Sequence, residues 1–103
     1  MNIINLTPHA IRVIGQEWTF DPSGTVARCA VTRESVGTLE GIPVNRTVFG
    51  LVENLPDAVP GTVYIVSSLV AQAAKDRKDL VIPDDIVRDD VGRIIGCRAF
   101  AQV

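Results

Sequence analysis

A polar segment near the N-terminus, Asn5 to His9, combines groups that can recognise a small molecule. Asn5 offers an amide, Thr7 a hydroxyl and His9 the chain's only imidazole, while Pro8 stiffens the bend that carries them. A stiff bend can hold several hydrogen-bonding groups around one point with little loss of conformational entropy on binding. We therefore expect Asn5, Thr7 and His9 to contact a ligand. The competing interpretation is that these side chains only satisfy the backbone of the turn.

A second candidate lies at the serine pair Ser67 and Ser68, where the apolar run Val63–Val66 gives way to a helical pattern. A helix N-terminus presents unpaired N–H groups and the positive end of the helix dipole, so two hydroxyls placed there could help to hold a phosphate. The chain has no glycine-rich loop followed by lysine at this point, which excludes a P-loop. Ordinary capping of the helix by a serine is the competing interpretation.

The basic residues are eight arginines and only two lysines. A guanidinium can bind phosphate through two parallel hydrogen bonds, so the bias permits anion recognition. Arg28 and Arg46 stand two positions from apolar residues in expected strands, so they lie on the same strand face as those residues. We expect Arg46, with Arg28 or Arg98, to neutralise a phosphate. Such arginines could instead be ion-paired or reach solvent. Phe49 and Tyr64 are candidate stacking surfaces for a base, with core packing as the alternative.

Patterns for catalysis and for metal binding are sparse. A single histidine excludes sites built from two histidines, and Cys29 and Cys97 have no CxxC partner. Two cysteines also cannot make the disulfide framework of a small secreted domain. We expect no metal, no cofactor and no catalytic residue. The alternative is a small hydrolase or lyase that uses His9 as general acid and base.

The length of 103 residues fits a single domain, residues 1–103. Apolar types supply 47% of the chain and charged types 21%, as in an ordinary globular protein. The net charge of −2 argues against a general nucleic-acid coat and against a polybasic membrane binder. The first residues lack a signal-peptide pattern, and no apolar run approaches the roughly 20 residues that span a bilayer. We expect a cytoplasmic protein, in the host cytoplasm if the chain is phage-encoded, with no nucleic-acid or membrane partner.

Composition and turn signals together favour a β-rich fold. Val, Ile and Thr make up 32 of the 103 residues, and their branched side chains suit a pleated sheet better than a helix. One helix of about eight to ten residues is expected after the serine pair, from its helical spacing of apolar residues. The expected extended segments are Asn2–Leu6, Ala10–Ile14, a strand around Trp18 and Phe20, Thr25–Arg33, Val36–Leu39, Ile42–Val52, Val63–Val66, Leu80–Ile82, Ile86–Asp89 and Arg93–Phe100. We predict the α+β class: a small, mostly antiparallel β-sheet or barrel-like domain with one short α-helix after a central strand.

Two turn signals make specific predictions within this fold. Glu40-Gly41, between two extended runs, predicts the tip of a β-hairpin. Pro83 is expected to end the strand that begins at Leu80, since proline has no N–H to donate to a sheet.

Four segments together resemble a family of small proteins found in phages and actinobacteria. They are Asn5-Leu6-Thr7-Pro8-His9, Phe49-Gly50, Val63-Tyr64-Ile65-Val66-Ser67 with Leu69-Val70-Ala71, and the tail Asp89…Gly92-Arg93-Ile94-Ile95-Gly96. The resemblance covers nearly the whole chain and implies a compact, cytoplasmic, phage-linked protein. Small phage proteins of this class include sponges that sequester the nucleotide signals of bacterial immune systems, so the resemblance implies that role by class.

The leading hypothesis is a binding protein that captures a phosphorylated, nucleotide-derived immune signal, either cyclic ADP-ribose-like or a cyclic dinucleotide, and so counteracts bacterial defence. Ser67 and Ser68 would hold its phosphate, and Asn5, Thr7 and His9 would read ribose or base edges. A chain of this size would hardly enclose such a ligand alone, so we expect a homo-oligomer with a shared site. The alternatives are the His9 hydrolase or lyase and a virion or partner-binding component with no small ligand.

Overall fold

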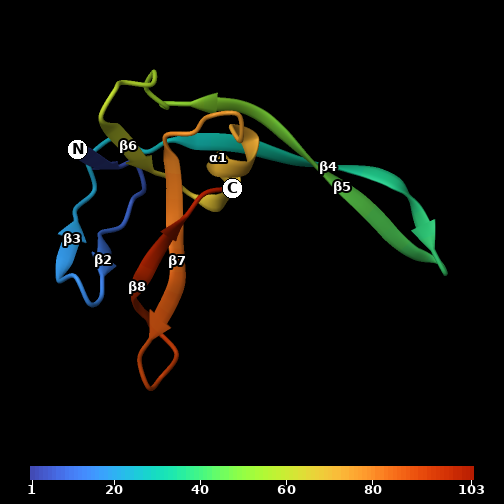
Figure 1. The fold of residues 1–103 in the computed structure, drawn as a ribbon. Helices are drawn as coiled ribbons and strands as arrows, with labels where there is room; N and C mark the ends of the chain where they lie inside the picture. Colours follow the sequence, from blue (N-terminus) through green and yellow to red (C-terminus); the bar gives the residue numbers. More distant parts are fainter.

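Short runs of β-branched residues, broken by turns, give a structure that is mostly β-sheet with one short helix. The computed structural model describes residues 1–103 and contains a six-stranded sheet that curls into a nearly closed barrel, with a long β-hairpin projecting from it (Figure 1). The elements are β1 Asn2–Asn5, β2 Ile11–Val13, β3 Trp18–Phe20, β4 Arg28–Leu39, β5 Ile42–Glu53, β6 Thr62–Ile65, α1 Ser68–Ala73, β7 Leu80–Arg88 and β8 Ile94–Ala101. The predicted class, a small barrel-like β domain with one short helix, is confirmed.

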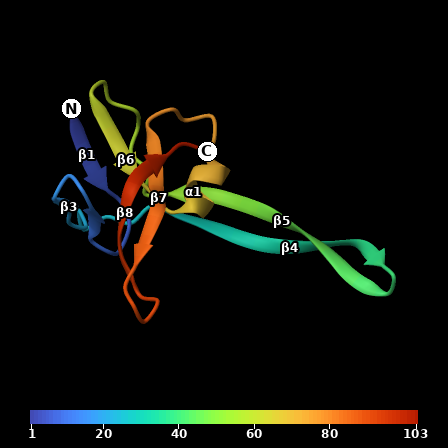
Figure 2. The same cartoon turned by 60° about the horizontal axis from the view of Figure 1, so that its bottom comes forward.

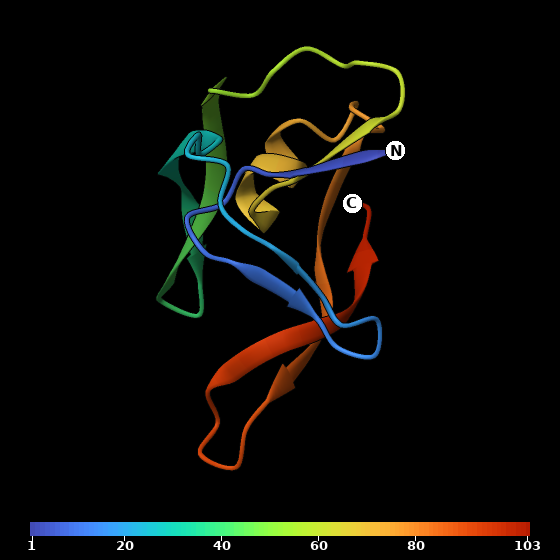
Figure 3. The same cartoon turned by 90° about the vertical axis from the view of Figure 1, so that its left-hand side faces the viewer.

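The six-stranded sheet has the order β1-β6-β7-β8-β2-β3 and mixes both strand directions. β1 runs parallel to β6, β6 to β7 and β8 to β2, whereas β7–β8 and β2–β3 are antiparallel. Parallel neighbours need a crossover between them, and α1 provides it between β6 and β7. The sheet is therefore mixed rather than mostly antiparallel. The α1 crossover contributes to this by bringing β7 alongside β6 in the same direction. Figure 3 shows the N-terminal strand, in blue, beside the yellow strand β6.

The hydrophobic core lies where α1 packs against the sheet. Its buried members are Leu6, Ala27, Tyr64, Val66, Val70, Ala71, Ala74 and Leu80. Only 14 of the 103 residues are buried, so the core is small and each buried contact supplies a large share of the stability. The helix spans six residues, shorter than expected, and ends at Ala73, with Ala74 as its C-cap. Its start is as predicted from the serine pair, since Ser67 is the N-cap and accepts a hydrogen bond from the Val70 N–H.

The hairpin formed by β4 and β5 leaves the body of the molecule soon after it begins. Cys29 and Val52 pack against the core at its root, and the rest projects away, as two directions of view show (Figures 1 and 2). We call the projecting part, residues 31–49, the arm. Its tip is the Glu40-Gly41 turn, as predicted, with φ of 52° and 80° at the two residues. Positive φ at both central residues is typical of the type I′ turn, whose twist matches that of the strands it joins.

Strand β7 continues through Pro83 instead of ending there. Pro83 pairs with Phe100 of β8, and the strand runs on to Arg88. On the other side, β6 pairs with β7 only at Leu80 and Val81. Pro83 therefore lies where β7 has a neighbour on one side alone, which is where a sheet tolerates a residue without an N–H.

Candidate functional site

The side chains of Asn5 and Thr7 hold the N-terminal bend together. The Asn5 amide nitrogen donates to the carbonyls of His9 and Phe20, at 2.7 and 2.9 Å. The Asn5 amide oxygen accepts from the Thr7 N–H and hydroxyl, at 2.9 and 2.7 Å. All the hydrogen-bonding capacity of Asn5 is thus used inside the protein, where its exposed fraction is 2%. Asn5 and Thr7 therefore satisfy the turn, as the competing interpretation held, and hold the main chain at His9 in place.

The strands that follow this bend enclose a pocket of about 440 Å³. β2 and β8 pair through Val13 and Cys97 alone, with one further hydrogen bond from the Ile14 N–H to the Cys97 carbonyl, 2.8 Å long. The ladder between the two strands is therefore short, and residues of β2, β7 and β8 line the opening beside it. The lining residues are His9, Ala10, Ile11, Arg12, Pro83, Ile86, Ile94, Ile95, Gly96 and Cys97.

Gly96 permits the close approach of β8 to β2 on which this pocket depends. A Cβ atom on Gly96 would lie 2.7 Å from the Arg12 carbonyl oxygen and 3.0 Å from Cδ1 of Ile14. The first distance is shorter than real Cβ contacts allow, so a side chain here would push the two strands apart. The glycine is required by the backbone of the neighbouring strand.

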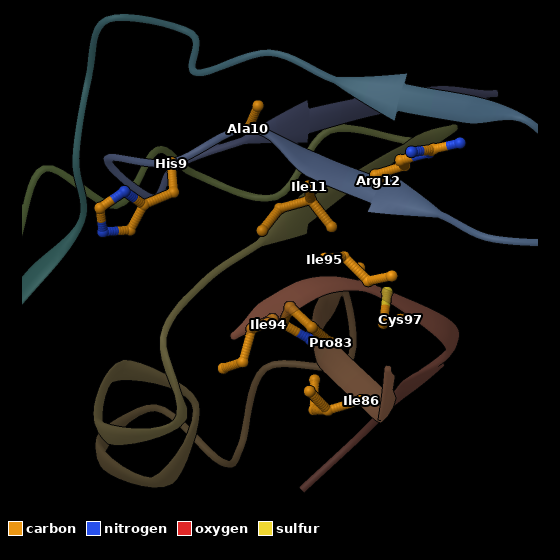
Figure 4. A pocket seen from close by; sticks show the side chains of 10 residues that line it. His9, Ala10, Ile11, Arg12, Pro83, Ile86, Ile94, Ile95 and Cys97 are labelled. Atoms are coloured by element: carbon orange, nitrogen blue, oxygen red, sulfur yellow. The ribbon is translucent and has the colours of Figure 1, made fainter. Parts of the chain in front are cut away.

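The pocket has an apolar middle and two polar residues at its border. Figure 4 shows Ile11 and Ile95 in the space between β2 and β8, the His9 ring at one side of it, and the Arg12 side chain extending away from the isoleucines. The Arg12 guanidinium lies 3.8 Å from the Glu17 carboxylate, and both side chains are largely exposed, at 56% and 78%. An exposed pair at this distance contributes little energy, so Arg12 is free to turn towards an anion. The arrangement can therefore take a flat apolar group on the isoleucines, a negative charge at Arg12 and a polar group at His9.

Cys97 lines the same pocket but is poorly suited to act as a nucleophile. Cys97 is buried, and this burial raises the pKa of its thiol. A thiol with a raised pKa forms less of the reactive thiolate at neutral pH. In Figure 4 the His9 ring and the Cys97 sulfur lie at opposite sides of the pocket, so His9 is not placed to take a proton from this thiol.

The serine pair belongs to the helix and not to the pocket. The Ser67 hydroxyl accepts from the Val70 N–H at 3.3 Å, and the Ser68 hydroxyl accepts from the Gln72 side chain at 2.9 Å. Neither residue lines the pocket. Capping, the competing interpretation, is what the structure shows for Ser67.

The arginines expected around a phosphate lie in separate places. Arg46 is in the arm and forms an ion pair with Glu34 of the opposite strand, at 3.2 Å. Arg28 lies at the root of the hairpin beside a polar depression, and Arg98 lies 3.8 Å from the Asp85 carboxylate. The three do not converge with the serines on one phosphate.

The two aromatic candidates also lie apart from the pocket. Tyr64 is a core residue with an exposed fraction of 3%, and its hydroxyl donates to the Asp57 carbonyl at 3.4 Å. Core packing, the alternative interpretation, is what the structure shows for Tyr64. Phe49 is half-buried in the arm, opposite Val31. Of the ten candidate residues, only His9 lines the pocket.

The pocket residues that sequence reasoning missed are Arg12 and the isoleucines of β2, β7 and β8. Strand alternation does not mark them, because the adjacent Ile94 and Ile95 are both exposed, at 60% and 43%, and Ile86 follows the exposed Asp84 and Asp85.

No family model, no curated protein and no solved structure matches this chain. None of its helices has the length and apolar character needed to cross a membrane. No group of three or more His, Cys, Asp or Glu side chains is placed to hold a metal ion.

Proposed function

We propose that this protein binds a small phosphorylated molecule of the nucleotide type in the pocket between β2, β7 and β8. The observation that supports this is a pocket of about 440 Å³ lined by isoleucines and bordered by His9 and by Arg12, whose exposed and loosely paired side chain can turn towards it. Pockets for small molecules commonly measure about 300–1,000 Å³ and combine an apolar lining with a few polar groups. A nucleotide has the matching parts: a flat base, a polar sugar and an anionic phosphate.

In this proposal each part of the pocket has one role. Ile11, Ile94 and Ile95 contact the face of the base, and Arg12 binds the phosphate in place of its loose contact with Glu17. His9, whose carbonyl is fixed by the Asn5 amide, offers its ring to the edge of the base or to the sugar. Cyclic ADP-ribose-like and cyclic dinucleotide signals of bacterial defence are the members of this class that the resemblance to phage proteins suggests.

We propose capture of the ligand instead of its conversion. The imidazole of His9 makes no hydrogen bond with another side chain, whereas a general base is usually oriented by one. The buried Cys97 thiol, with its raised pKa, is no better candidate for a nucleophile. A protein that binds such a signal tightly without cleaving it would lower the free concentration of that signal.

The direct test measures binding of AMP, cyclic ADP-ribose and cyclic di-GMP by calorimetry and native mass spectrometry. Arg12→Gln should weaken binding at least tenfold, because a hydrogen bond to a charged group contributes about 1.5–3 kcal/mol. Arg33→Gln is the matched control, because Arg33 lies on the arm, away from the pocket, and should leave the affinity unchanged.

The fate of the ligand separates the proposal from its rivals. Bound ligand recovered intact after heat denaturation supports capture, and altered ligand would instead indicate an enzyme. Absence of binding to all three probes, or equal affinity of the Arg12 and Arg33 variants, contradicts the proposed pocket.

A further inference from the structure

The arm carries an exposed apolar stripe along one of its faces. Residues at alternate positions of β5 point to the same side, and each shares that side with its cross-strand partner in β4. On one face this places Leu39 with Ile42, Gly37 with Val44, Glu34 with Arg46 and Thr32 with Val48. The apolar members are Leu39, Ile42, Val44 and Val48, whose exposed fractions run from 38% to 67%.

This stripe is unusual for a part of a protein that stands alone in water. A two-stranded ribbon is marginal by itself and normally needs a third strand or a packed face to stabilise it. The arm has neither, since its strands pair only with each other and it projects from the body (Figures 1 and 2). A contiguous apolar patch that remains exposed usually marks an interface.

The charges on the same face indicate what covers it. Glu34 and Arg46 lie side by side across the ladder, 3.2 Å apart, in the middle of the stripe. A second arm laid face to face and pointing the same way presents Arg46 opposite Glu34, and Ile42 opposite Leu39. The stripe is therefore complementary to itself in charge as well as in apolar character, as an isologous interface requires.

We propose that this face of the arm binds the same face of a second copy of the chain and forms a two-fold dimer. In the dimer the two apolar stripes pack together, and Glu34 of each copy pairs with Arg46 of the other. It covers the ribbon face that each chain leaves exposed. This inference does not depend on the proposed ligand, because the pocket between β2, β7 and β8 shares no residue with the stripe.

The first test is the mass of the intact protein in solution, measured by sedimentation equilibrium at about 1–100 μM. We expect a dimer that Val44→Asp converts to monomer, because the aspartate would bury an unpaired charge. The matched control is Thr47→Asp, on the opposite face of the same ribbon, which should stay dimeric. A wild-type protein that remains monomeric over the whole range overturns the proposal, as does a Val44→Asp protein that dimerises as tightly as wild type.

Reversing the charge at Glu34 or at Arg46 distinguishes a specific effect on the interface from disruption of the arm. Glu34→Arg alone and Arg46→Glu alone each place like charges on the interface and should both be monomeric. When the two variants are mixed, one arm is wholly basic and the other wholly acidic at these positions, so a mixed dimer should form. If the mixture stays monomeric while wild type is dimeric, the interface lies elsewhere and the proposal is overturned.

Discussion

The side-chain amide of Asn5 donates a hydrogen bond to the main-chain carbonyl of Phe20, 2.9 Å away, and so joins the end of β1 to the end of β3. These are the two outer strands of the sheet order, so the contact helps to close the barrel. An isolated bridge between Asn5 and Pro22 reinforces the same closure. A residue that looks like a ligand contact in the sequence is therefore a structural link between the sheet's own edges.

Replacing Asn5 should destabilise the protein more than its small volume suggests. Asn5→Ala removes the acceptor of the Thr7 N–H and the amide donor to the carbonyls of His9 and Phe20, and each buried unsatisfied group costs about 1–3 kcal/mol. We expect a loss of about 2–5 kcal/mol in the free energy of unfolding, measured by urea denaturation. Asn45→Ala, on the exposed arm, is the control and should change stability by less than about 0.5 kcal/mol. Similar losses in both variants would contradict the role of Asn5.

Ser67 provides a test that separates helix capping from phosphate binding. Ser67→Ala removes the acceptor of the Val70 N–H and should cost about 0.5–2 kcal/mol of stability. Ligand affinity should stay within about twofold of wild type, since Ser67 is outside the pocket. Ser68→Ala is the companion variant, because its hydroxyl only accepts an exposed bond from Gln72 and should matter less. A tenfold loss of affinity in the Ser67 variant would restore the phosphate role that its position first suggested.

Gly96 controls how closely β8 approaches β2. Gly96→Ala would set a methyl group 2.7 Å from the Arg12 carbonyl oxygen, so we expect about 1–3 kcal/mol of destabilisation as the strands separate. The comparison is Gly50→Ala, whose nearest atom would be the Ala30 Cβ at 3.1 Å, and a smaller loss is expected there. Thermal unfolding of the two variants decides the question. Equal melting temperatures would show that the β2–β8 approach is not constrained by this glycine.

The Arg77–Asp79 pair predicts a loss of stability in acid. Arg77 donates to both carboxylate oxygens of Asp79, at 2.8 and 2.7 Å, and to the Pro56 carbonyl at 2.9 Å. The hydrogen bond from Arg77 lowers the pKa of the Asp79 carboxyl, while partial burial opposes the shift. The folded state therefore binds this proton less readily than the unfolded chain, whose aspartates titrate near pH 3.9. The stability from this pair is present above about pH 4 and is lost as the pH falls through the folded pKa.

Asp79→Asn tests this dependence. It should lower the free energy of unfolding at pH 7 by about 1–3 kcal/mol, because it removes a charge-assisted, two-pronged contact. The difference from wild type should shrink below about pH 4, where wild type loses the same charge. Asp76→Asn, at an exposed neighbouring position, controls for general charge effects. A difference that stays constant from pH 7 to pH 3 would contradict the assignment.

Local signals predicted the elements well, because turn chemistry is encoded in adjacent residues. Glu40-Gly41 forms the tip of the hairpin and Ser67 caps the helix, as their residue types indicate. Pairing direction was less accessible, since it depends on strands far apart in the chain, such as Asn2 with Thr62. Pro83 was expected to end its strand because the sequence does not reveal that β7 lacks a neighbour on one side there.

The candidate site was predicted only in part. His9 lies in the pocket, but the residues expected beside it serve the backbone, the helix, the core or the arm. The pocket lies beside the short β2–β8 ladder, and that pairing is a property of the assembled sheet. Sequence reasoning favoured polar residues, whereas six of the ten residues that line this pocket are hydrophobic. The arginine that reaches the pocket, Arg12, stood out from the other seven only once the strands were placed.

The parallel pairing of β1 with β6 also sets the order in which the protein can assemble during synthesis. Asn2 of β1 pairs with Thr62 of β6, sixty positions later in the chain. At about 5–20 residues per second, the ribosome needs roughly 3–12 s to make that interval, so β1 emerges first and waits unpaired. The β4–β5 hairpin joins near neighbours and can close within microseconds of its emergence. Strand β8 follows the other pocket strands in the chain and completes the walls of the pocket, so ligand binding would report that translation and folding have both passed β8.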